Sequence, residues 1–325
     1  MAGVRRTDFT EAMKKDMYDY YLDWERYQEI APVYESLFDI MPSSAAYEKF
    51  NSAIGLGDLL EKPEGEDLKA DAPLEGYTIW CKNRTYGRQL RFTFEGVKDN
   101  QKFPDFLRTT VGSWKDSLVR TKDRFYVQFF NKGALSAGHD VFNNTLTGLV
   151  SSTDDPTGDL IYDNQAFFAT AHPDKVGGTY ANLTVSRALN HDNLETTWET
   201  FTSTNNRDER GNEIELMPNV LVIPPQLKFT ADRILKSTNI PDSADNDINA
   251  MYGIVQPQVW QRLSDSDGWF LGVRNMGLMG TDRMAPELDF YQDETSKDYY
   301  ATIIYRFGGC VTNWRFWYAC NVAQS

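Results

Sequence analysis

The sequence contains little histidine or cysteine and lacks the short motifs that mark common enzymes. It has three residues of each type, and GxxxxGK[ST], strand-linked GxGxxG, HExxH and GxSxG are all missing. A phosphate-binding loop, a dinucleotide fold, a zinc protease and a hydrolase elbow therefore have no support. His139 and His191 stand in polar segments, and His172 before Pro173 is typical of a hydrogen-bonded structural histidine. We predict no catalytic residue, no metal site and no cofactor.

The three cysteines give no sign of a shared site. Cys81, Cys310 and Cys320 lie far apart and outside any CxxC spacing, which indicates neither a disulfide framework nor a zinc site. We interpret all three as small buried hydrophobic residues. No apolar run is long enough to cross a bilayer, and no apolar stretch follows the arginines of the start, MAGVRRTDF. We therefore expect neither a signal peptide nor a membrane partner, and synthesis in the cytoplasm.

Positive charge is scarce. There are 33 lysines and arginines against 47 acidic residues, a net charge of −14, which argues against a protein dedicated to binding nucleic acid. The 325 residues are 41% hydrophobic and 14% aromatic, as in a folded globular protein, and allow about two domains.

The most strongly patterned stretch runs from Asp208 to Ser237. Val220–Ile223 form the continuous apolar run of a strand covered on both faces, and Pro224 and Pro225 end it. A helix follows with four apolar residues on one face: Leu227, Ala231, Ile234 and Leu235. Because strand ends in α/β proteins often bind ligands, the junction could be either a site or a core.

The first hundred residues suggest an arm and a hairpin. A helix with one apolar face is predicted from Asp8 to Trp24, and a short helical pattern from Tyr47 to Ile54. The arm's apolar residues include Phe9, Met13, Met17 and Trp24, which could pack either on the same subunit or on a neighbour. Residues 58–76 form an acidic, exposed segment, followed by a hairpin with its turn at 83–87. Its basic cluster, Lys82, Arg84, Arg88 and Arg91, either faces solvent or contacts an acidic neighbour.

The remaining chain alternates helices and strands. The longest helical pattern covers 104–132, with Gly112 inside it as a weak spot or a close packing point. A loop follows from 133 to 163, then a helix that Asp192 and Glu195 cap. A strand is predicted at 269–273 and an aromatic hairpin at 299–320, with its turn at Gly308-Gly309. Strands and helices in this order predict mixed α/β or α+β packing.

An acidic, tryptophan-rich chain can also be a glycoside hydrolase, which uses two carboxyl groups. Glu287 and Asp289 after Pro286 are the candidates in sequence. Many other carboxylates could be named equally well, so solvated acidic loops are the better interpretation.

The order of several motifs resembles the major capsid proteins of tailed bacteriophages, in particular the Mu-like major head subunit group with the Hong Kong 97-type fold. The first motifs are GLG at 55–57, EG at 64–65, Tyr86-Gly87 and the long helix, then AFFATAHP at 166–173 and Asn182-Leu183-Thr184. The later ones are Gly211, PNVLVIPPQL at 218–227, Ala231, Ile234-Leu235, Asn246, Ile248, Asn249, Trp269-Phe270-Leu271, Tyr305-Arg306-Phe307-Gly308 and Trp314-Arg315. Two departures are the segment NKGALSAGHDVFNN and Asp174, where an asparagine is common.

The resemblance implies an α+β fold with five parts. They are an N-terminal arm (1–54), an extended β-hairpin loop (55–102), a peripheral domain with the spine helix (103–165), an axial α/β domain (166–295) and a C-terminal β-hairpin (296–325). If the loop is an independent part, deleting residues 60–98 should leave a folded subunit that forms no shells.

The function implied is assembly rather than catalysis. Copies of the chain would form hexamers and pentamers that close an icosahedral shell around double-stranded DNA, with weak and non-specific DNA contact. About 100 residues precede the spine helix, so a scaffolding domain is not expected, and scaffolding would come from a separate protein. A portal and a decoration protein are further expected partners. The expected location is the virion, after assembly in the cytoplasm of the bacterial host. The basic cluster and the arm are the candidate contacts between subunits.

Overall fold

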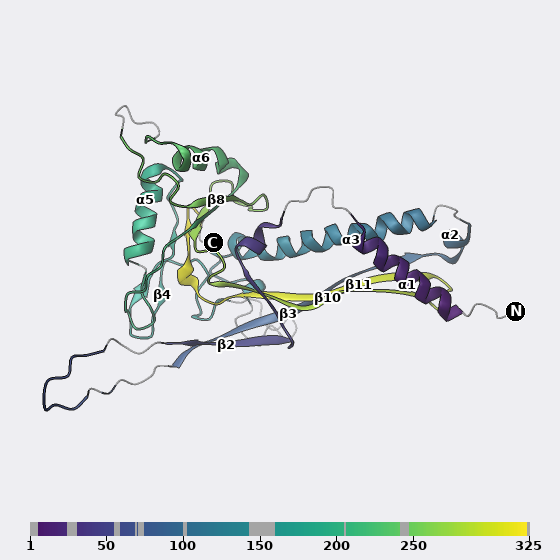
Figure 1. The fold of residues 1–325 in the computed structure, drawn as a ribbon, viewed down its shortest axis with the longest axis horizontal. Helices are drawn as coiled ribbons and strands as arrows, with labels where there is room; N and C mark the ends of the chain where they lie inside the picture. Colours follow the sequence, from purple (N-terminus) through teal and green to yellow (C-terminus); the bar gives the residue numbers. More distant parts are fainter. Residues whose placement is uncertain are drawn as a thin grey trace.

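The computed structural model describes residues 6–24, 31–54, 59–68, 70, 75–99, 103–142, 160–204, 206–240 and 247–323. They form two five-stranded sheets and a two-stranded sheet, with helices packed beside them (Figure 1). The α+β class expected from the sequence is confirmed. Within the described residues, every helix is too short or too polar to span a membrane.

The longer sheet forms an elongated body, with the strand order β1-β10-β11-β3-β2 (Figure 1). Its strands are β1 (Asp39–Pro42), β2 (Tyr47–Ala53), β3 (Glu75–Phe92), β10 (Leu278–Gln292) and β11 (Tyr299–Val311). β11 pairs antiparallel with β10 and with β3, and the β3 ladder runs from Phe92 opposite Tyr299 to Asn83 opposite Gly308. From Lys82 downward β3 pairs with β2 instead, so the two strands leave the body as a ribbon.

The second sheet has the order β6-β12-β9-β7-β8 and carries two helices. Its elements are β6 (Leu183–Thr184), β7 (Val220–Ile223), β8 (Gln256–Val259), β9 (Trp269–Gly272), β12 (Trp317–Cys320), α5 (His191–Glu199) and α6 (Lys228–Lys236). Leu221 and Ile223 pack with Ile234 of α6, whereas Val220 and Val222 belong to the cluster around Phe130. The predicted strand covered on both faces is thus confirmed, and so is the helix after the two prolines.

Short elements complete the fold. They are η1 (Val33–Ser36), α2 (Phe94–Asp99), α4 (Gln128–Asn131), η2 (Asp140–Phe142), β4 (His172–Pro173), β5 (Thr179–Tyr180), η4 (Thr200–Thr204), η5 (Pro225–Leu227) and η6 (Trp314–Phe316). The cap of α5 is Asn190, whose side chain accepts a hydrogen bond from the Asn193 amide, so the capping box at Asp192 was wrong. An asparagine before the first turn satisfies the same free amides.

The predicted spine is helix α3 (Phe103–Tyr126), continued by α4 after a break at Val127. It lies along the long strands (Figure 1). Leu107, Val111 and Trp114 share one face and are buried with Ile303 of β11. One apolar stripe at helical spacing therefore places the spine on the sheet.

Helix α1 (Arg6–Leu22) packs across α3 and β10. Trp24, just beyond it, covers Gly112 of the spine, where an added Cβ atom would lie 2.3 Å from a Trp24 ring carbon. The indole nitrogen donates to Asp116 at 3.0 Å. The interpretation of Gly112 as a close packing point is confirmed.

Replacing Gly112 by leucine should separate the arm from the spine. Leucine favours the helix by up to about 1 kcal/mol over glycine, but overpacking typically costs about 1–3 kcal/mol, so the net effect is destabilising. We expect faster proteolysis near residue 24 and a lower urea midpoint. Ser113→Ala, at the exposed neighbouring position, is the control. Equal proteolysis of the two variants would show that Trp24 does not hold the arm.

Three sequence-based assignments in the long sheet were wrong. Residues 47–53 are strand β2 rather than a helix, because the Tyr47 ring contacts Trp80 across the ribbon at 5.2 Å and Phe50 packs on Cys81. Contacts made by tertiary structure override a spacing that suits a helix equally well.

The second error is the turn at 83–87, since these residues lie inside the continuous strand β3. Gly87 is there because a Cβ atom would come 2.9 Å from the Ile303 carbonyl oxygen. The real hairpin is β2, the exposed loop and β3. Deleting residues 60–98 would therefore remove β3 from the interior of the sheet, so the expectation that the deleted chain folds was wrong.

The third error is the C-terminal hairpin at 299–320. β11 runs through Gly308 and Gly309 without a turn and pairs with β10, whereas β12 joins the second sheet. β10 itself escaped detection, because register shifts between Asp282 and Met284 and between Met284 and Glu287 break its alternation.

Candidate assembly surfaces

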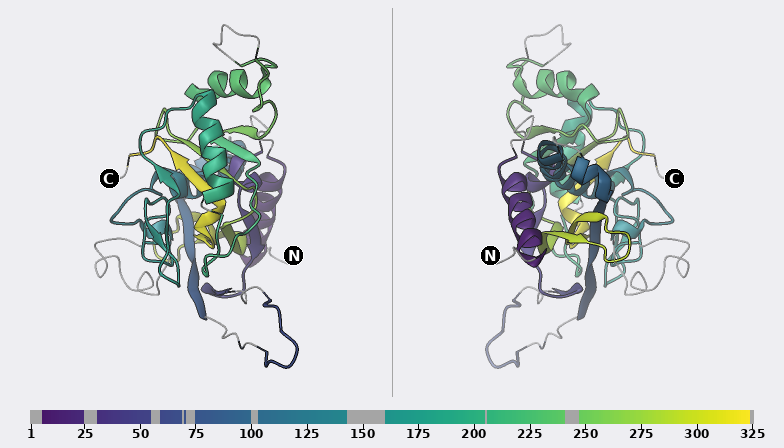
Figure 2. Two further views of the ribbon diagram at one scale, coloured as in Figure 1. Left: turned by 90° about the vertical axis from the view of Figure 1, so that its left-hand side faces the viewer. Right: turned by 90° about the vertical axis from the view of Figure 1, so that its right-hand side faces the viewer.

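The loop between β2 and β3 projects from the body at its described residues 59–68 in each view (Figures 1 and 2). Its described residues 59–68 and 70 are all exposed, as predicted for this segment. Leu59, Leu60 and Leu68 are 102%, 63% and 78% exposed beside four carboxylates and one lysine. Exposed leucines on a projecting segment make it a candidate contact surface for another molecule.

The ribbon is fastened to the body by Asn83. Its side-chain nitrogen donates to the Ser43 hydroxyl at 2.7 Å and to the Ala45 carbonyl at 2.9 Å. Its side-chain oxygen accepts from the Thr281 hydroxyl at 2.7 Å. Since Asn83 is 5% exposed, these buried bonds link β3 to β10 and to the chain before β2 at one point.

Two residues further along β3, Cys81 is joined to Cys310 of β11 by a disulfide across 229 residues. Burial of all three cysteines is confirmed, but the expectation of no disulfide was wrong for this pair. The sequence separation concealed it, because only the pairing of β3 with β11 brings the two residues together. Cys320 stays a free, buried thiol.

Tyr77, nearer the loop, touches the region of β4 and β5. The Lys175 ammonium lies 3.7 Å from the centre of its ring, and the Tyr162 ring lies 5.2 Å away. Burial raises the pKa of Tyr77, and Glu209 and Asp163 raise it further, so the phenol is neutral. The cation–π contact adds a third attachment for the ribbon.

The basic cluster does not act as one surface. Arg84 pairs with Asp140 at 2.7 Å and Arg91 pairs with Asp298 at 2.6 Å, both within the subunit. Lys82 is half-buried. Arg88 is exposed, and within the described residues it forms no ion pair. A contact with a neighbouring subunit stays a prediction for these four.

The arm candidates are likewise engaged inside the subunit. Met17 is fully buried and Met13 packs beside it, in the cluster that contains Leu288 of β10. Trp24 covers Gly112 as described above. The side chain of Phe9 lies outside the described residues. Packing on the same subunit, one of the two alternatives, accounts for Met13, Met17 and Trp24.

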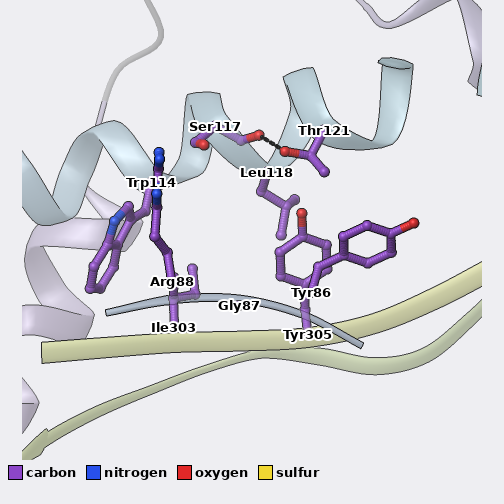
Figure 3. A pocket seen from close by; sticks show the side chains of 9 residues that line it. All are labelled: Tyr86, Gly87, Arg88, Trp114, Ser117, Leu118, Thr121, Ile303 and Tyr305. Carbon is purple, nitrogen blue, oxygen red and sulfur yellow. Dashed lines mark hydrogen bonds between the residues drawn. The ribbon is translucent and has the colours of Figure 1, made fainter. Parts of the chain in front are cut away.

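A cavity of about 180 Å³ separates the spine from β3 and β11 (Figure 3). Trp114, Tyr86 and Tyr305 form aromatic walls, and Arg88 rises beside Trp114. Ser117 and Thr121 line it from the helix, and the Thr121 hydroxyl donates to the Ser117 carbonyl oxygen at 2.7 Å. The lining residues include no paired carboxylates and no nucleophile beside a base.

Several of the resembling motifs meet in one buried network. The Nδ1 atom of His172 lies 2.6 Å from Asp163, and its Nε2 atom lies 3.0 Å from the Asn182 side-chain oxygen. The ring stacks on Trp314 at 4.0 Å. Because both ring nitrogens face oxygen acceptors and no nucleophile is in contact, His172 is a structural histidine, as predicted.

Asn182 holds that network together. Its oxygen accepts from the Ala169 amide at 2.8 Å, and its nitrogen donates to the Phe167 carbonyl at 2.8 Å. The residue is 1% exposed. The motifs at 166–173, 182–184 and 314–315 are therefore fold markers that meet in space.

Asn182→Ala should destabilise the subunit by roughly 2–6 kcal/mol, because it leaves two buried backbone groups unpaired and each costs about 1–3 kcal/mol. The urea midpoint of the purified subunit measures this. Asn193→Ala is the control, since the bond from its side chain to Ala188 is exposed and should change stability by less than about 1 kcal/mol. Similar midpoints would contradict the role of the network.

The glycosidase candidates occupy the surface of β10. Glu287 and Asp289 are exposed, and Asp289 pairs with Lys14 at 3.1 Å. Neither lies against the apolar walls that a catalytic acid requires. Across the ranges that the structure describes, acidic, histidine and cysteine side chains form no cluster suited to a metal ion.

A family model described as phage capsid protein matches residues 77–320. The chain belongs to the phage capsid protein family. The match begins within β3 and includes the spine, β10, β11 and the whole second sheet, and the chain is accordingly a phage capsid protein, a structural protein of the virion. No curated protein sequence matches it.

Solved capsids share the fold of this capsid protein. The capsid of an empty GTA particle has 13% identity and a TM-score of 0.53, covering 93% of this chain and 96% of that chain. The structure of Microbacterium phage Oxtober96 has 12% identity and a TM-score of 0.50, covering 99% of this chain and 100% of that chain. The capsid of cyanophage P-SCSP1u has 10% identity and a TM-score of 0.51, covering 93% of this chain and 92% of that chain. The Hong Kong 97-like fold is confirmed.

Proposed function

We propose that copies of this capsid protein form hexamers and pentamers that close into an icosahedral shell around double-stranded DNA. The projecting loop with its three exposed leucines carries the proposal. Burying each leucine on a neighbour would contribute about 1.5–3 kcal/mol before the cost of ordering the loop. A shell that places the same chain in five-fold and six-fold rings needs a contact on an adaptable ribbon, and β2 with β3 supplies one.

The parts of the subunit take matching roles in this proposal. The arm (1–54) and loop (55–102) contact neighbours through the residues that the subunit leaves exposed, and their strands β1, β2 and β3 join the spine, β10 and β11 in the peripheral body. The second sheet with α5 and α6 forms the axial domain near the capsomer axis. Arg88, exposed on the body, is the best placed of the basic residues to meet the acidic loop of a neighbour.

Other proteins complete the assembly that we propose. A separate scaffolding protein guides closure, a portal occupies one vertex, and a decoration protein is a further partner. With a net charge of −14, contact with packaged DNA is weak and non-specific. Assembly takes place in the bacterial cytoplasm, and the role is not enzymatic.

Electron cryomicroscopy of particles from cells that express the chain with its scaffolding protein tests this proposal. We expect rings of five and six subunits, with residues 59–68 of each subunit against the next. A density map in which the loop contacts no second subunit would refute the role given to it.

A further inference from the structure

The disulfide lies where the ribbon leaves the body. Asn83 opposite Gly308 is the last registered pair between β3 and β11, and each cysteine stands two residues beyond it on its own strand. On its other side Cys81 pairs with Glu48 of β2. The bond therefore spans the point at which β3 exchanges its body partner for its ribbon partner.

Beyond this point β3 no longer pairs with β11. Residues 75–82 of β3 pair with β2 alone, and β2 is the edge strand of the sheet. A two-stranded ribbon is marginally stable in water and can twist relative to its sheet. Its attachments to the body include the bonds of Asn83, the contacts of Tyr77 with Lys175 and Tyr162, the packing of Ile79 on Cys310, and the disulfide, which is the covalent one.

The two sulfurs form an isolated redox pair. Both cysteines are fully buried against Ile79. The third thiol, Cys320, lies in the other core cluster, and burial raises its pKa to about 12, so it is a poor partner for exchange. Cys81 and Cys310 can therefore be oxidised and reduced without exchange with Cys320.

We propose that Cys81 and Cys310 are a thiol–disulfide latch that sets the stiffness of the extended ribbon. The latch rests on the proposed function. In the reducing cytoplasm both cysteines are thiols, and the ribbon can adjust during assembly. After release from the cell the disulfide fixes the ribbon root, the point at Asn83 where the ribbon leaves the body. The reaction with oxidised glutathione is balanced. One cysteine thiolate displaces glutathione to give a mixed disulfide, and the other displaces the second glutathione.

Because both sulfurs are buried, an oxidant reaches them only when the ribbon root opens. The rate of oxidation therefore reports opening at Asn83, and Asn83→Ala should accelerate it by roughly tenfold for a loss of about 1.4 kcal/mol of local stability.

Thiol counting tests the latch. Full-length chain is trapped in intact cells with an alkylating reagent, then unfolded and analysed by mass spectrometry. We expect three modified cysteines per chain in cells, and one, Cys320, after incubation of purified protein with oxidised glutathione. A persistent count of three after oxidation, or of one inside reducing cells, would overturn the latch.

Hydrogen exchange measures the stiffness. Amides of residues 47–53 and 75–82 should exchange at least about tenfold more slowly in the oxidised chain than in the reduced chain. The C81S/C310S double variant should match the reduced chain with or without oxidant, and C320S should match wild type. Equal exchange in oxidised and reduced wild type would refute the proposal.

Both measurements can be made on unassembled subunits as well as on shells. Absence of shells with a normal thiol count would count against the proposed function alone. Normal shells, together with the same amide hydrogen exchange of the ribbon in oxidised and reduced chains, would count against the latch alone.

Discussion

Replacing Leu59, Leu60 and Leu68 together by serine is expected to prevent nearly all shell formation and to leave the subunit folded. The three side chains are each 63% or more exposed, so they contribute little to the stability of the isolated subunit. Exposed substitutions usually change stability by no more than about 0.5 kcal/mol each. Loss of three leucines from an interface should lower the yield of shells by about two orders of magnitude, after the cost of ordering is subtracted.

The matched variant changes the charges instead. Replacing Glu61, Glu64, Glu66 and Asp67 by the corresponding amides retains the leucines and the length of the loop. We expect a weaker effect that high salt reproduces in wild type, because surface charges are screened. Velocity sedimentation of each preparation gives the shell fraction, and the urea midpoint gives stability. A normal fraction of shells from the serine variant would show that the loop is not part of the interface between subunits.

The second large effect is expected from Gly308→Ala. An added Cβ atom would lie 2.1 Å from the Lys82 carbonyl oxygen, between two central strands. Backbone on both sides cannot move away without separating β3 from β11, together with the Asn83 network beside them. We expect a loss of about 4 kcal/mol or more, seen as insoluble protein or a much lower urea midpoint.

Its neighbour is the control. At Gly309 the nearest atoms, the Met279 oxygen and a Tyr126 ring carbon, are both 3.1 Å from the added Cβ. A small shift can relieve that contact, so Gly309→Ala should cost far less. Equal losses for the two variants would show that the approach of β3 to β11 at Gly308 is not what requires glycine.

Local pattern was sufficient where one rule decided the outcome. The continuous apolar run of β7, the prolines after it and the stripe of α3 each depend on neighbours in sequence, and each was predicted correctly. The capsid fold followed from the order of motifs, not from any single motif. The structure shows why they recur together, since His172, Asn182 and Trp314 meet in one buried network.

Pattern failed where strands meet across long distances. Gly308-Gly309 is a turn signal in sequence, yet both glycines serve the close packing of strands in the middle of a sheet. Residues 47–53 became a strand through contacts with β3. Cys81 and Cys310 are adjacent only because β3 pairs with β11. The point where the ribbon leaves the body and the disulfide beside it could therefore not be predicted from the sequence before that pairing was known.

The intersubunit surfaces show the same limit. Sequence placed the acidic loop correctly, but it could not tell that Arg84 and Arg91 bind carboxylates of their own subunit. Apolar spacing in the arm likewise could not distinguish a contact within the subunit from a contact with a neighbour, and Met17 is buried within its own subunit. What distinguishes them is exposure, which leaves the leucines of the loop as the strongest candidates.

Self-assembly is the central claim, and velocity sedimentation of the purified full-length chain, with negative-stain images of each fraction, tests it most directly. We predict rapidly sedimenting rings and closed shells in the megadalton range. A single slow species of 37.2 kDa at every concentration, with or without scaffolding protein, would contradict it.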